Sequence, residues 1–122
     1  MKFAFATDDD LNFTKRHFGS ADHYLIFSFF DGKLNFESKI KNNSIEEEIH
    51  GDPKKAKSVE QILNEVDVLV SKIFGPNINK MEEKFIVVVM NSTWNLDAAK
   101  KIILEKIDVV KNNMNSKDIL FF

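Results

Sequence analysis

Residues 23–40 read HYLIFSFFDGKLNFESKI, and this stretch decides how the chain folds. Its first half is apolar on both faces, which is typical of a strand that is covered on both sides. Asp31-Gly32 follows and favours a type I′ turn, because both central positions of that turn need positive φ. In residues 33–40 the side chains then alternate between two faces, and one face has Leu34, Phe36, Ser38 and Ile40. We therefore predict a hairpin whose second strand is half exposed and lies at the edge of a sheet.

Three further segments have strand patterns: residues 3–7, 66–73 and 85–90. Helices are predicted from Asp52-Pro53, in a short segment that ends near Lys84, and from Asn95 to Asn113. The order β, β, β, α, β, α, β, α predicts an α/β fold with a mixed five-stranded sheet and about three helices. With right-handed crossovers the strand order is 3-2-1-4-5, and strand two is antiparallel to its neighbours.

Length and composition describe one ordinary globular domain. The 122 residues, 43% hydrophobic and 30% charged, suit a single domain over residues 1–122 with one core. Residues 112–117 are polar and are expected to fray. The apolar end, Ile119-Leu120-Phe121-Phe122, is expected to dock on the sheet or on a partner, so we predict a frayed or docking tail from about residue 114.

Charge and composition also narrow the functions to expect. A net charge of −2 argues against nucleic-acid partners. No apolar run is long enough for a membrane span and no signal peptide is recognisable, so we expect a cytoplasmic protein with no membrane partner. The chain has no cysteine, which excludes disulfides, a thiol nucleophile and thiolate-held metal centres.

In this topology strands one, three, four and five finish at the same end of the sheet, which we call the rim. Ligands of open α/β sheets bind at such a rim. The long loop over residues 8–21 reaches it and carries Lys15, Arg16, His17 and Gly19, while residues 75–77 follow strand four. His23 and His50 are expected there too. We expect Gly19 and Gly75 to have positive φ, and either could let backbone N–H groups approach an anion.

Each candidate also has a simpler interpretation. His17 could hydrogen-bond its own loop, and His23 and His50 could be structural or solvent-exposed. Clustered carboxylates at Asp8-Asp9-Asp10 suggest a cation site, although loop acids more often cap turns and face water.

Three blocks resemble the dinitrogenase iron-molybdenum cofactor biosynthesis family, which includes small cofactor-carrier proteins and the C-terminal part of the cofactor synthase. The blocks are Phe3-Ala4-Phe5-Ala6-Thr7-Asp8-Asp9, His17-Phe18-Gly19-Ser20-Ala21 with Tyr24-Leu25-Ile26-Phe27, and Val66-Asp67-Val68-Leu69-Val70 with Phe74-Gly75-Pro76-Asn77-Ile78. The resemblance covers about residues 1–110. Asp10-Leu11-Asn12 stands where the family often has a glycine after the paired acids.

The resemblance implies a ribonuclease H-like fold and a ligand class: a labile, anionic iron–sulfur or molybdenum–iron–sulfur cluster, carried without chemical change. It also implies partners, namely metallocluster donor and acceptor proteins. We expect the chain to be a monomer or weak homodimer. With the rim, the resemblance leads us to expect a cofactor site whose residues are Lys15, Arg16, His17, Phe18, Gly19, Gly75, Pro76 and Asn77. We expect His17 and His50 as metal ligands, and His50 is included because the predicted topology places it at the rim.

Two other functions remain open. The Asp8-Asp9-Asp10 cluster would suit a metal-dependent hydrolase or nuclease of ribonuclease H-like fold, if other carboxylates joined it. The apolar end over residues 119–122 would suit a protein-interaction module.

Overall fold

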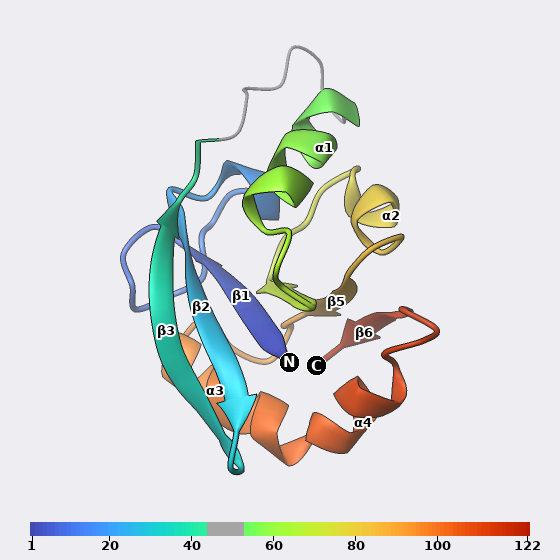
Figure 1. Ribbon diagram of the computed structural model, residues 1–122. Helices are drawn as coiled ribbons and strands as arrows, with labels where there is room; N and C mark the ends of the chain where they lie inside the picture. The colour runs from blue at the N-terminus through green and yellow to red at the C-terminus, as the bar shows by residue number, and fades with distance from the viewer. Residues whose placement is uncertain (44–52) are drawn as a thin grey trace.

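The computed structural model describes residues 1–43 and 53–122 and contains one six-stranded sheet in the order β3-β2-β1-β4-β5-β6 (Figure 1). The strands are β1 (Lys2–Thr7), β2 (His23–Phe30), β3 (Lys33–Lys41), β4 (Val68–Ser71), β5 (Ile86–Val89) and β6 (Ile119–Phe121). The predicted order 3-2-1-4-5 is confirmed, and β2 is antiparallel to both of its neighbours. The count of five strands is wrong, because β6 adds to β5 in parallel.

Helices cover both faces of this sheet (Figure 1). They are η1 (Phe18–Ser20), α1 (Pro53–Ile62), α2 (Ile78–Met81), α3 (Leu96–Glu105) and α4 (Ile107–Asn112). The alternation in β1 explains the two layers. Phe3 and Phe5 pack with α3 and α4, whereas Ala4 and Ala6 leave room for the η1 loop, α1 and α2 on the opposite face. The helix predicted at Pro53 does begin there, and its predicted cap, Asp52, lies outside the described residues.

The hairpin turn has the predicted conformation, with φ of 53° at Asp31 and 71° at Gly32. The predicted clean alternation of β3 is wrong. Ile26 pairs with Ser38 but Phe27 pairs with Phe36, so Glu37 is an extra residue in a β-bulge. The bulge moves Ser38 and Ile40 to the face opposite Leu34 and Phe36, because one inserted residue reverses the alternation.

The single predicted helix over residues 95–113 is two helices. Asn95 caps α3, because its side chain accepts the Ala98 N–H at 2.9 Å. The helix is interrupted at Lys106, where φ is −109°. Ile103 of α3 and Val110 of α4 still enter the same core cluster. The apolar spacing is therefore the same as in an unbroken helix, which is why the pattern could not show the break.

The segment for which we predict fraying contains a hydrogen-bonded turn over residues 113–118. The Asn113 side chain is buried, donates to the Asp118 carbonyl at 2.7 Å and accepts the Asp118 N–H at 3.1 Å. This turn directs the chain into β6. Among the described residues, no helix is long and apolar enough to cross a membrane.

Candidate functional site

The rim is built as predicted from β1, β3, β4 and β5, which finish there, and from β2, which begins there. The unpredicted β6 also finishes there. The loop after β1 leaves Thr7 in a tight turn. Asp9 accepts the N–H groups of Leu11 and Asn12 at 2.9 and 2.8 Å. These hydrogen bonds lower the pKa of Asp9. Asp10 has a φ of 66°, a backbone conformation that glycine adopts without strain. This conformation suits the glycine that often follows the paired acids in the family that the sequence resembles.

Asp8 ties the loop to itself. Its carboxylate accepts from the Thr14 hydroxyl at 2.8 Å, the Asp22 N–H at 2.9 Å and the Arg16 guanidinium at 3.1 Å. Burial alone would raise the pKa of Asp8, but these three donors outweigh it and the pKa is lowered. Arg16 also bonds the Asp22 carboxylate at 2.9 Å, which raises the Arg16 pKa. The charge of Arg16 is therefore already balanced within the loop.

Asp10 ties the loop to the hairpin. Its carboxylate bonds His23 Nε2 and the Lys39 ammonium, the latter at 2.9 Å. The hydrogen bond from Lys39, and then the one from His23, lower the pKa of Asp10. His23 thus lies at the rim, as predicted, and its side chain is mostly covered in this contact.

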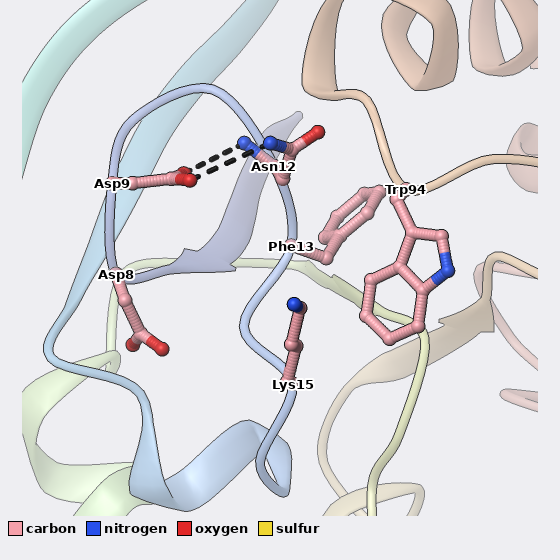
Figure 2. Close-up of a pocket in the computed structure, with 6 residues that line it drawn as sticks. All are labelled: Asp8, Asp9, Asn12, Phe13, Lys15 and Trp94. Carbon is pink, nitrogen blue, oxygen red and sulfur yellow. Dashed lines mark hydrogen bonds between the residues drawn. The ribbon is translucent and has the colours of Figure 1, made fainter.

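The loop is also joined to the segment that follows β5. The Phe13 N–H donates to the Trp94 carbonyl at 2.8 Å, and the Leu96 N–H donates to the Leu11 carbonyl at 3.0 Å. Between the two segments is a cavity of about 440 Å³ (Figure 2). Its lining residues are Asp8, Asp9, Asn12, Phe13, Lys15 and Trp94.

His17 borders a second, shallower depression of about 350 Å³. The residues that line it are Lys15, Arg16, His17, Ser20 and Ile73. Lys15 thus lines both hollows, and it forms no ion pair within residues 1–43 and 53–122. It is the cation of this loop that remains available to an anionic ligand.

Gly75 supports the imidazole of His17. A Cβ added at Gly75 would lie 2.5 Å from His17 Nδ1 and 2.8 Å from Cε1, far closer than side chains approach each other. Gly75 also has a φ of 79°, so the predicted positive φ is confirmed. The glycine turn after β4 therefore forms the surface against which the His17 ring rests.

Phe18 anchors the loop beneath His17. It is fully buried, its N–H donates to the Ile73 carbonyl at 2.8 Å, and its ring stacks on Phe74 at 5.1 Å. The Tyr24 hydroxyl donates to the Phe18 carbonyl at 2.9 Å, and burial raises the pKa of that hydroxyl. Phe18 holds the site in place from below, since its ring does not reach the open depression.

The other predicted site residues divide into two groups. Gly19 is buried in η1 and lacks the positive φ expected of it; its carbonyl accepts the Asn42 side chain at 2.8 Å. Pro76 and Asn77 follow Gly75 but do not line the His17 depression. His50 lies outside the described residues. The structure therefore brings together Lys15, Arg16, His17 and Gly75.

The aspartates at residues 8–10 do not converge. Asp8 bonds Arg16, Asp9 caps its own turn, and Asp10 bonds His23 and Lys39. Across residues 1–43 and 53–122, no group of three or more His, Asp or Glu side chains is arranged to hold a metal ion. Their role in the structure is to shape the loop.

Sequence reasoning missed Ser20, Ile73 and Lys72. The Lys72 ammonium bonds the carbonyls of Met90 and Asn91 at 3.1 and 2.9 Å and lies 5.0 Å from the Trp94 ring. A lysine directly after an apolar strand was the available signal, because its charge must find partners at the strand end. Lys72 holds Trp94 and the end of β5 in place.

The comparisons with known proteins agree with this architecture. The model of the dinitrogenase iron-molybdenum cofactor family matches residues 1–105. The crystal structure of a provisionally named dinitrogenase from Methanocaldococcus jannaschii superposes with a TM-score of 0.58 at 20% identity, covering 86% of this chain and 88% of that one, which supports the fold alone. A search of curated proteins found no significant match. Because the family model spans most of the sequence, this chain belongs to the dinitrogenase iron-molybdenum cofactor family.

Proposed function

We propose that the protein binds an anionic iron–sulfur or molybdenum–iron–sulfur cluster, or a precursor of one, at the depression beside His17 and carries it without chemical change. The main observation behind this proposal is the position of the His17 imidazole. The ring rests against Gly75 and borders an open depression that Lys15 also lines. Membership of the cofactor family supplies the ligand class.

The chemistry of these side chains suits such a cargo. A neutral imidazole is a good ligand for iron, and the Lys15 ammonium offsets the negative charge of a thiometallate. Arg16 contributes less charge than the sequence suggests, since Asp8 and Asp22 already pair with it. No cysteine is present to form a lasting thiolate bond, so the cargo would be released readily.

The same proposal includes the cellular setting. A labile cluster needs a donor protein and an acceptor protein, and an open depression leaves one face of the cargo accessible to each. We place this exchange in the cytoplasm. We also assign the fold to the ribonuclease H-like group, on the support of the 3-2-1-4-5 strand order with β2 antiparallel.

The two alternative functions have less support. A metal-dependent hydrolase or nuclease would need carboxylates that converge, whereas Asp8, Asp9 and Asp10 bond separate partners. An interaction module was suggested by an unpaired apolar end, but residues 119–121 pair with β5 as the sixth strand.

The proposal is tested by titrating the protein with tetrathiomolybdate under anaerobic conditions and following visible absorption. We expect His17→Ala to weaken binding by at least about tenfold, the usual effect of disturbing a metal-binding shell. His23→Ala is the matched control, because His23 lies at the same rim, where it bonds Asp10, but does not line the depression beside His17. Equal binding by all three proteins would show that the site is wrong.

A further inference from the structure

β3 forms one edge of the sheet, because no described strand pairs with its outer side (Figure 1). The strand is nine residues long and mostly exposed, and Phe36 is 59% exposed although it packs against the core aromatic Phe27. An edge strand presents unpaired N–H and C=O groups that can bond a further strand. Its length and its exposed aromatic ring make β3 a candidate pairing surface.

The register shows which groups of β3 face outward. The Phe29 N–H donates to the Met1 carbonyl, so Phe29 faces β1 and its neighbour Ser28 faces β3. Ser28 is opposite Asn35, whose backbone therefore points inward. Leu34 and Phe36, on either side of Asn35, point their N–H and C=O groups away from the sheet.

We propose that two copies of the chain pair through β3, antiparallel, about a two-fold axis at Asn35. Leu34 of each copy is then opposite Phe36 of the other, and both pairs are hydrogen-bonded pairs because both residues face outward. The two apolar side chains lie on the face of the sheet that α3 and α4 cover. Lys33 of each copy is opposite Glu37 of the other.

The charged side chains of β3 favour pairing with a second copy of the chain over pairing with an unrelated strand. They also favour the register centred on Asn35 over one centred on Ile40. The two Lys33–Glu37 contacts join opposite charges, which stabilise cross-strand pairs. Pairing centred on Ile40 would instead place Lys39 of one copy opposite Lys41 of the other. The bulge at Glu37 ends the regular edge, so pairing is confined to residues 33–37.

So short a pairing predicts a weak dimer. Five residues a side bury much less than the roughly 1,200 Å² of a stable interface, so association should depend strongly on protein concentration. The axis at Asn35 lies near the hairpin turn, at the opposite end of β3 from the rim. Both His17 depressions therefore stay open in the dimer.

A single-cysteine variant tests the register directly, because the natural chain has no cysteine. In the proposed dimer the two positions 35 face each other with Cα atoms about 4.5 Å apart, a distance that a disulfide can span. Oxidised Asn35→Cys should form a covalent dimer. Lys33→Cys is the matched control on the same strand and face, since its two copies would be roughly 14 Å apart. Equal cross-linking of both variants, or of neither, would overturn the proposal.

A second measurement leaves Asn35 intact. Sedimentation equilibrium of the natural chain should show a concentration-dependent dimer. Glu37→Lys should weaken dimerisation by roughly fivefold, by placing like charges opposite each other, and adding Lys33→Glu should restore it. Both variants lose the 3.2 Å bond between Lys2 and Glu37, so their difference isolates the contact across the axis. We take roughly 1 mM as the highest dissociation constant that the proposed pairing allows. A natural chain that stays monomeric at that concentration would contradict the pairing. So would a double variant that dimerises as weakly as the single variant.

Discussion

At the scale of single residues, the position of His17 depends on a residue far away in the chain. Gly75 has a positive φ. It also has no room for a Cβ, because the His17 ring occupies that space. The sequence could predict the φ, since a glycine before a strand-to-helix turn is typical of it. It could not predict the contact between Gly75 and the His17 ring, because that contact depends on the course of the irregular loop between β1 and β2.

Gly75→Ala should therefore displace His17 and weaken tetrathiomolybdate binding about as much as His17→Ala does. The positive φ alone should cost about 1–3 kcal/mol of stability. Gly32→Ala separates the two effects, because Gly32 has a φ of 71° with nothing within 4 Å of its added Cβ. It should lose similar stability but keep full binding. Binding by Gly75→Ala as strong as by Gly32→Ala would show that the ring contact does not matter.

The loop that carries His17 should also depend on the charge of Asp8. The pKa of Asp8 is lowered in the folded protein from its ordinary value of 3.8, so its contribution to stability is present above that value and is lost as the pH falls through the folded pKa. Asp8→Asn should lower the melting temperature at pH 7. The difference from the natural chain should shrink below about pH 4. Thermal melts from pH 7 to pH 2 measure this, and a difference that is constant with pH would contradict it.

At the scale of elements, the sequence predicts those strands and helices that have a local pattern of apolar residues. The apolar run before Asp31-Gly32 and the alternation after it identify the hairpin, and continuous apolar residues identify β4 and β5. The bulge at Glu37 changes the pairing by one residue, and no single residue type signals it. β6 was missed because its three residues are stabilised by pairing with β5, a contact distant in sequence.

The turn into β6 should depend on the side chain of Asn113, which bonds both backbone groups of Asp118. Asn113→Ala should lower the free energy of unfolding by about 1–3 kcal/mol, because two partly buried hydrogen bonds to the Asp118 backbone are lost. Asn112→Ala is the control, since Asn112 is exposed. Chemical denaturation of both variants measures the difference, and equal stability would mean that β6 does not need this turn.

At the scale of the whole molecule, the sheet topology brings the site together. The parallel pairing of β1 with β4 places the carboxyl ends of these strands side by side, so the His17 loop and the Gly75 turn meet at the rim. The sequence predicted this meeting from topology alone. It did not predict that Asp8 and Asp22 balance Arg16, because that depends on the course of an irregular loop. Lys15, which forms no ion pair among the described residues, and His17 both line the depression that the proposed function uses.

The central claim is that this rim holds a metal–sulfur cluster through His17. The most direct measurement is the iron, molybdenum and sulfide retained per chain after anaerobic reconstitution with ferrous iron, sulfide and tetrathiomolybdate, followed by gel filtration. The natural chain and His23→Ala should retain the same amount of metal, and His17→Ala should retain almost none. Equal retention by His17→Ala, or none by the natural chain, would contradict the claim.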